Sequence, residues 1–305
     1  KERKETNVPD SSGHPDRYVP PLTCHTFMVN VSLGKQTGGW TVDKTYPIFS
    51  DITILPSHFP IFDAGVLPIN AFVLKGKEPV LVDTGMGIDS EAFVDALLSV
   101  VDPPDLKWLW LTHDDADHTG SIKKIFEIFP NVRLATNSLT VLRMTTFWPV
   151  PMDRAYWLNP GDSLKLSDRI LSAIRPPLFD NPATIGMYDS KSKSFFSADC
   201  FGGLIPSPVD SVDEIPKDRL LQGMVSWASG DCPWLHMIET KLFNEVLYKI
   251  RQLSPEIILS SHLPPAYGKT EQLLDFIATV PSSTPFVAPD QSTLQQILTR
   301  MKVNS

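Results

Sequence analysis

Residues 113–118 hold two histidines and three aspartates directly after a short, mostly apolar stretch that contains two tryptophans. Buried carboxylates packed this closely repel one another and are costly to desolvate, and a bound cation removes both problems. Imidazole binds zinc, copper, iron and nickel, while carboxylate oxygen suits harder ions, so the mixture indicates iron, manganese or zinc. A solvated acidic loop that caps the next helix is the alternative. The run supplies the first candidate site residues: His113, Asp115, Asp117 and His118.

The pattern around this run predicts an α/β fold. Two apolar stretches separated by the turn-like Lys-Gly-Lys-Glu-Pro predict a β-hairpin, and helical spacing follows it. The later half repeats this style of short strands followed by helices. The strands are expected near 71–74, 80–82, 106–111, 132–135, 163–167, 169–174, 184–188, 194–198 and 257–259. The helices are expected near 88–101, 121–129, 138–144, 220–227, 235–253, 271–279 and 290–302.

Two β-rich halves, each followed by helices, predict one internally pseudo-symmetric α/β sandwich. Residues 1–26 are polar and lack periodicity, so we expect a flexible N-terminal tail or arm. Residues 27–305 are then expected to form a single domain. Pro56 and Pro60 are expected to break the apolar stretch at 52–62.

Composition narrows the class of partner and the compartment. The net charge of −8, without a dense Lys/Arg cluster, argues against nucleic acid or an anionic membrane as the main partner. No apolar stretch approaches the roughly 18 to 20 residues of a membrane span. The first residues lack the apolar region of a signal peptide, although a trimmed targeting segment stays open. Cys24, Cys200 and Cys232 form neither a disulfide framework nor a CxxC pair, so a reducing cytoplasm is expected.

The histidine–aspartate run resembles the His-x-His-x-Asp-His motif of the metallo-β-lactamase superfamily, with Asp115 in place of the second histidine. A carboxylate at that position is typical of flavodiiron proteins, which carry His-x-Glu-x-Asp-His. Residues 83–85, 196–202 and 261–264 resemble, in order, the superfamily's early Asp-Thr-Gly, the segment with the bridging aspartate and the last histidine segment. The resemblance spans roughly residues 50 to 275 and implies a four-layer αββα sandwich.

The resemblance also implies two metal half-sites. His113 and Asp115 would bind one metal, and Asp117, His118 and His262 would bind the other, with Asp199 as the bridge between them. Asp180 stands where the family has a histidine, and it either ligates the first metal or leaves an open position. Asp117 and Asp199 are the expected catalytic residues. Asp83 is expected to support the site by hydrogen bonding.

Some residues outside the motifs are candidates for pocket walls. His58 lies in an apolar stretch and is a candidate for lining the pocket. Four aromatic residues in irregular or proline-flanked segments, or at the ends of elements, are either walls of the cavity or ordinary core: Trp148, Tyr156, Trp227 and Trp234.

The favoured function is redox chemistry at two iron ions, with zinc or manganese as alternatives. Such a protein binds or reduces O₂, NO or peroxide, or senses them. In flavodiiron proteins the electrons come from an FMN in a following flavodoxin domain, whereas this chain ends about 40 residues after His262. We therefore expect that this chain binds no FMN and that a separate protein donates the electrons. The oligomeric state stays open, with a homodimer as one possibility.

The second hypothesis is metal-assisted hydrolysis. Most members of the superfamily use two zinc ions to generate a hydroxide nucleophile and to polarise an ester, amide or phosphodiester. Asp117 would then orient the water or accept its proton. Asp115 and Asp180 both replace histidines that dizinc hydrolases keep, which favours iron or manganese. A binding module with a degenerate site is the third alternative.

Overall fold

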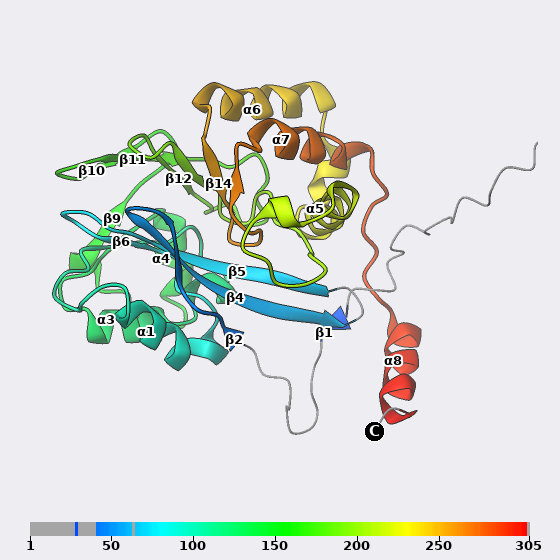
Figure 1. Cartoon of the computed structure of the whole chain (residues 1–305), viewed down its shortest axis with the longest axis horizontal. Coiled ribbons are helices and arrows are strands. Elements are labelled where there is room, and N and C mark those ends of the chain that lie inside the picture. The colour runs from blue at the N-terminus through cyan, green and yellow to red at the C-terminus, as the bar shows by residue number, and fades with distance from the viewer. Residues whose placement is uncertain (1–27, 30–40, 63–64, 304–305) are drawn as a thin grey trace, which may run out of the picture.

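The computed structural model describes residues 28–29, 41–62 and 65–303, and their strands form two β-sheets that pack face to face (Figure 1). The first sheet contains β1 (Met28–Val29), β2 (Thr41–Val42), β3 (Tyr46–Phe49), β4 (Ile52–Phe62), β5 (Gly65–Leu74), β6 (Val80–Val82), β7 (Trp108–Trp110), β8 (Arg133–Thr136) and β9 (Ala155–Trp157). The second contains β10 (Ser163–Lys165), β11 (Ile170–Ile174), β12 (Gly186–Asp189), β13 (Ser194–Phe196), β14 (Ile257–Leu259) and β15 (Ala266–Tyr267).

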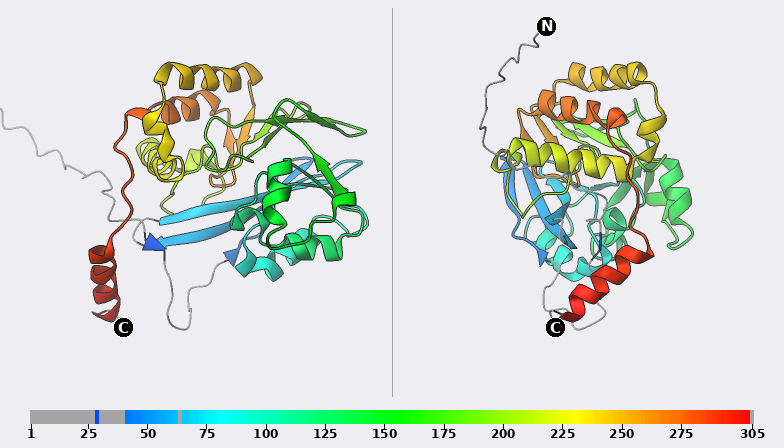
Figure 2. Two further views of the ribbon diagram at one scale, coloured as in Figure 1. Left: turned by 180° about the vertical axis from the view of Figure 1, so that it is seen from behind. Right: turned by 90° about the vertical axis from the view of Figure 1, so that its right-hand side faces the viewer.

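Helices cover the outer face of each sheet, which gives four layers (Figures 1 and 2). The first sheet is covered by α1 (Ser90–Leu98), α3 (Ile122–Ile128) and α4 (Ser138–Met144). The second is covered by α5 (Lys217–Asp231), α6 (Thr240–Leu253) and α7 (Thr270–Ala278). The short α2 (Ala116–Thr119) lies within the histidine–aspartate run, and α8 (Gln291–Val303) lies apart from both helical layers (Figure 1).

Alternation along the strands builds three buried cores between the four layers. In β5, Phe72 faces the opposite sheet, while Val73 faces the helices. In β13, Phe196 faces the opposite sheet and Phe195 faces α5 to α7. Because successive side chains of a strand point to opposite faces, a strand buried on both faces reads as a short continuous apolar run.

The expectation that prolines break the stretch at 52–62 was wrong, because β4 runs unbroken through Pro56 and Pro60. Pro56 lies opposite Asn70 of β5, yet the Asn70 backbone N–H donates to Ser261. The backbone of Pro56 therefore faces away from β5. On that side the Asp43 backbone N–H, which lies between the short strands β2 and β3, donates to the Pro56 carbonyl. Proline is tolerated there because no continuous neighbour needs its missing donor.

The other expected elements are present, with shifted ends and three differences. The helix expected over 235–253 is a 3₁₀ turn at Pro233–Met237 followed by α6. The helix expected over 220–227 is part of the longer α5, and the sequence did not predict α2, β9 or β15. The expected tail at 1–26 and Cys24 lie outside the described residues, so the division into tail and single domain stays a prediction. No helix among the described residues is long and apolar enough to cross a bilayer.

Candidate metal centre

Four strand ends bring the expected site residues to one edge of the sandwich. β6 and β7 are parallel neighbours in the first sheet, and β13 and β14 are parallel neighbours in the second. Asp83 follows β6 and His113 follows β7, while Asp199 follows β13 and His262 follows β14. The carboxyl ends of parallel strands meet at one edge, which is where α/β proteins place their sites.

Each of the three histidines has one ring nitrogen engaged on the side away from the centre. His118 Nδ1 lies 2.9 Å from Asp83 Oδ2, and His262 Nδ1 lies 2.8 Å from the Pro68 carbonyl oxygen. His113 Nδ1 lies 3.0 Å from Thr112 Oγ1. This pattern fixes the ring orientation, as partners of metal-bound histidines do, and it turns all three Nε2 atoms inward.

The Asp199 carboxylate lies between these inward nitrogens. Its Oδ2 is 3.3 Å from His113 Nε2, and its Oδ1 is 3.0 Å from His118 Nε2 and 3.2 Å from His262 Nε2. Oδ2 therefore faces His113, and Oδ1 faces His118 and His262. Ala198 and Phe201 have φ values of 53° and 68°, so the backbone around Asp199 is held in a left-handed conformation that such residues seldom adopt.

The first half-site consists of His113, Asp115 and Asp180, whose ligand atoms lie within 4.8 Å of one another. Asn181, to which the sequence analysis gave no role, donates its amide to Asp115 Oδ1 at 3.0 Å. The other oxygen, Asp115 Oδ2, lies 3.8 Å from His113 Nε2. Asp180 is the exposed member of this half-site.

The second half-site consists of Asp117, His118 and His262, again within 4.8 Å. Asp117 Oδ2 is 3.3 Å from His262 Nε2 and 3.6 Å from His118 Nε2. Its side chain is 28% exposed, whereas both histidines are buried. The second half-site is therefore closed by imidazoles on the protein side and opens toward solvent at Asp117.

In the absence of an ion, these groups shift one another's pKa values. Burial opposes the charge on Asp199, but His113, His118 and His262 outweigh it and hold the pKa of Asp199 well below its usual range. Burial likewise opposes the charge on His262, but Asp199 raises the pKa of His262 to about 9. Desolvation and the charge of Asp199 raise the pKa of Asp180 to about 6.

Buried atoms without partners show that the cluster fits a metal. His113 Nε2, His118 Nε2 and Asp199 Oδ1 are buried, and none has a hydrogen-bond partner among the described residues. Buried polar atoms are normally paired, and leaving one unpaired costs about 1–3 kcal/mol. Nitrogen and oxygen donors that converge on one another without forming hydrogen bonds are what a cation requires.

Among the residues around the half-sites, Asp83 was expected from the sequence and Asn181 was missed. Asp83 accepts from the Thr112 backbone and hydroxyl besides its contact with His118, which agrees with the expected supporting role. Asp114 is held instead by Arg143 at 2.7 Å and by Asn181 at 2.9 Å, so it lies outside the half-sites. Asn181 follows Asp180 directly, and that adjacency was the only sequence signal for it.

Of the candidate wall residues, Trp227 lies in the site and the others do not. Its ring centroid is 4.9 Å from that of His262. Trp148 packs on Phe126, and Trp234 packs on Phe179. Tyr156 packs edge-on against Trp108 in the first sheet.

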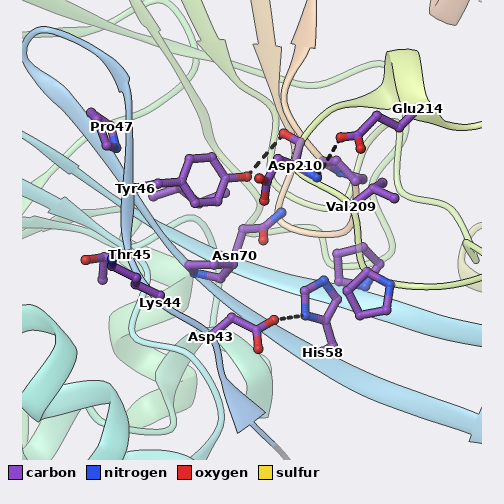
Figure 3. Close-up of a pocket in the computed structure, with 15 residues that line it drawn as sticks. Asp43, Lys44, Thr45, Tyr46, Pro47, His58, Asn70, Val209, Asp210 and Glu214 are labelled. Carbon is purple, nitrogen blue, oxygen red and sulfur yellow. Dashed lines mark hydrogen bonds and ion pairs between the residues drawn. The ribbon is translucent and has the colours of Figure 1, made fainter.

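His58 lines a different cavity, of about 670 Å³, whose lining includes none of the half-site residues (Figure 3). There it pairs with Asp43 at 2.6 Å, while the Tyr46 hydroxyl donates to the Asp210 carbonyl. The wall of this cavity at Pro68 and Asn70 touches the segment that carries His262, since Asn70 donates its amide to the Ser260 and Leu263 carbonyls.

Two stacked sheets flanked by helices, with a histidine–aspartate cluster at their strand ends, define a protein of the metallo-β-lactamase fold, as expected. The model of the ODP family beta lactamase matches residues 67–262, and the chain belongs to this family. The match begins in β5 and ends on the last expected ligand.

Relatives of this chain include flavodiiron proteins. The flavo-diiron protein FprA2 of Clostridium acetobutylicum is 30% identical over 252 residues, which cover 69% of this chain and 60% of that protein. An uncharacterized protein of Methanocaldococcus jannaschii, MJ0732, is 26% identical over 193 residues, 63% of this chain and 48% of that one. The chain thus spans about half the length of such relatives.

Solved structures show the same fold. The flavodiiron protein from Giardia intestinalis aligns with a TM-score of 0.67 at 16% identity, over 79% of this chain and 60% of that one. The rubredoxin oxygen:oxidoreductase from Desulfovibrio gigas aligns with a TM-score of 0.66 at 18% identity, over 78% and 61%.

Proposed function

We propose that this chain is a di-iron protein that binds or reduces O₂, NO or peroxide, or senses them. The observation that carries the proposal is the placement of Asp199, with one oxygen toward His113 and the other toward His118 and His262. A carboxylate placed this way is suited to bridge two ions. Kinship with flavodiiron proteins supports the choice of iron.

The donor set favours iron over zinc. The first half-site offers one imidazole and two carboxylates besides Asp199, and the second offers two imidazoles and one carboxylate. Zinc sites rely more on nitrogen and sulfur donors, whereas carboxylate oxygen suits harder ions. Manganese shares that preference, so the metal must be measured.

Two adjacent iron ions would supply electrons and paired positions for a diatomic ligand. The chain's own residues would hold these positions: Asp83, Thr112 and the Pro68 carbonyl fix the three imidazoles, and Asn181 fixes Asp115. We assign Asp117 and Asp199 as the residues next to the reacting ligand, since Asp117 stands on the open side. The Trp227 ring packs against His262, with the two ring centroids 4.9 Å apart.

We further propose that electrons arrive from a separate donor protein and that residues 1–305 bind no FMN. Titration of the protein with FMN, followed by flavin fluorescence, tests it. A cytoplasmic location remains a prediction, as does a homodimer, which sedimentation velocity would test.

Metal analysis combined with absorption spectra of anaerobic protein, before and after exposure to O₂, tests the main proposal. We expect two iron ions per chain and an absorption band that appears with O₂. Two zinc ions together with esterase or phosphodiesterase turnover would instead establish the hydrolase hypothesis.

A further inference from the structure

The last turn of α5 brings a carboxylate to the metal cluster that the motifs do not include. Asp231 ends this helix, and its carboxylate lies with those of Asp180 and Asp199 so that one oxygen of each is within 4.8 Å of the others. The residue is half-buried. It stands 32 residues beyond Asp199 in the sequence, in no recognisable ligand motif.

One face of α5 is fixed against the centre, which makes this placement specific. Gly223, Trp227 and Asp231 are four residues apart and share that face. A Cβ on Gly223 would lie 2.0 Å from the Leu204 carbonyl oxygen, so the helix packs directly on the segment that follows Asp199. One turn later, the Trp227 ring lies against His262. The next turn delivers Asp231.

The three carboxylates are not matched by basic side chains of lysine or arginine. Among the described residues, neither residue type forms an ion pair with Asp180, Asp199 or Asp231. The side-chain partner of Asp231 is the thiol of Cys232, 3.5 Å from its Oδ2. Burial raises the pKa of that thiol, so it stays protonated and donates. A neutral donor does not offset the repulsion between neighbouring carboxylates.

An independent observation indicates what belongs there. His113 Nε2 is fully buried, has no hydrogen-bond partner among the described residues, and lies 3.3 Å from Asp199 Oδ2. His113 also groups with Asp115 and Asp180, and Asp180 is shared with the Asp231 group. A buried imidazole nitrogen that forms no hydrogen bond and a group of oxygen donors therefore meet at the first half-site.

We infer that Asp231 is a further ligand of the metal ion at the first half-site, beside His113, Asp115, Asp180 and Asp199. This inference rests on the proposed dinuclear function. It makes the two half-sites chemically unlike: the first is dominated by carboxylate oxygen and the second by imidazole. The first half-site should therefore favour a hard ion such as Mn²⁺ or Fe²⁺ more than the second half-site does.

The test compares Asp231→Asn with the unchanged protein and with Asp218→Asn, an exposed carboxylate on the same helix. Metal-free protein is titrated with Mn²⁺ alone and with Zn²⁺ alone, with equilibrium dialysis and Mn²⁺ paramagnetic resonance as readouts. We expect two Mn²⁺ sites in the unchanged protein and in Asp218→Asn. In Asp231→Asn, one Mn²⁺ site should weaken by about tenfold or more, while the other is unchanged. Zn²⁺ binding should change less.

Two further measurements separate ligation from a structural role. Asp231→Glu keeps the carboxylate and should retain part of the lost Mn²⁺ affinity. Metal-free Asp231→Asn should melt no lower than the metal-free parent, because the change removes a repelling charge. A lower melting temperature, or Mn²⁺ affinities within about twofold of the parent, would overturn the inference. Fewer than two metal sites in the parent would overturn the proposed function as well.

Discussion

At the scale of single residues, the centre depends most on Asp199, because it alone faces both half-sites. We expect Asp199→Ala to lose both metals, whereas Asp180→Ala should weaken only the metal at the first half-site. Elemental analysis after dialysis against metal-free buffer measures both. Retention of two metals by Asp199→Ala would refute the bridging role.

Asp83 is placed to support metal binding through its contact with His118. Its carboxylate holds His118 Nδ1 at 2.9 Å and also accepts from Thr112. Asp83→Asn should lower metal affinity by about 10–100-fold, the usual effect of losing an outer partner. Competition with a chelator measures this. Asp114→Asn is the control, since Asp114 is held by Arg143 rather than by a ligand, and an equal loss there would contradict the assignment.

The sequence predicted best those site residues that are close to one another along the chain. His113, Asp115, Asp117 and His118 are close in sequence, so the run already placed them together. Asp199 and His262 were predicted from short segments that resemble the family's segments in the same order along the chain. Asp231 and Asn181 could not be predicted, because Asp231 reaches the site only through helix packing and Asn181 through a side-chain amide.

At the scale of elements, the helix ends differ in backbone conformation. Ser254 caps the C-terminus of α6 with a left-handed φ of 46°, while Ser99 caps the C-terminus of α1 with a φ of −73°. Both hydroxyls donate to the carbonyl three residues earlier. A left-handed residue other than glycine costs roughly 1–2 kcal/mol, so the two positions should respond oppositely to glycine.

We expect Ser254→Gly to raise the free energy of unfolding by about 0.5–1 kcal/mol. Ser99→Gly should lower it, since glycine there only adds freedom to the unfolded chain. Urea denaturation of both variants measures the difference. Equal effects in one direction would show that the hydroxyl contacts, rather than backbone conformation, decide stability.

The strands show where local patterns suffice. Buried runs such as β14 and the hairpin of β5 and β6 were expected close to their observed positions, because burial on both faces leaves a continuous apolar signature. The prediction for β4 was wrong at Pro56, because the sequence does not reveal that its neighbour on that side is broken into β2 and β3. Tertiary context decided that element.

At the scale of the whole molecule, the cluster links stability to pH. In the metal-free protein, burial and nearby carboxylates raise the pKa of Asp231 to about 7, and that of Asp180 is raised to about 6. Asp199 raises that of His262 to about 9 despite burial. Each lies above its unfolded value, so the stability it contributes is present at low pH and lost as pH rises through the folded pKa.

The metal-free protein should therefore melt at progressively lower temperature from about pH 5 to about pH 9. Metal binding displaces these protons, so the rise in melting temperature on adding Mn²⁺ should grow over the same range. Thermal melts with and without the ion measure both trends. Asp199 has a lowered pKa, so the stability it contributes is constant across this window and is lost only below about pH 4. A metal-induced rise that shrinks with pH would contradict the ligand set.

The ligands come from both sheets: His113 and His118 follow β7, whereas Asp199 and His262 follow β13 and β14. A bound pair of ions is thus a reversible cross-link between two sheets whose named strands, in the described part of the chain, do not pair with each other. Such a cross-link restricts the unfolded chain much as a long-range covalent bond does. Losing the ions would loosen the edges of both sheets together. The occupancy of a buried centre would therefore change how exposed and how mobile the edges of the two sheets are.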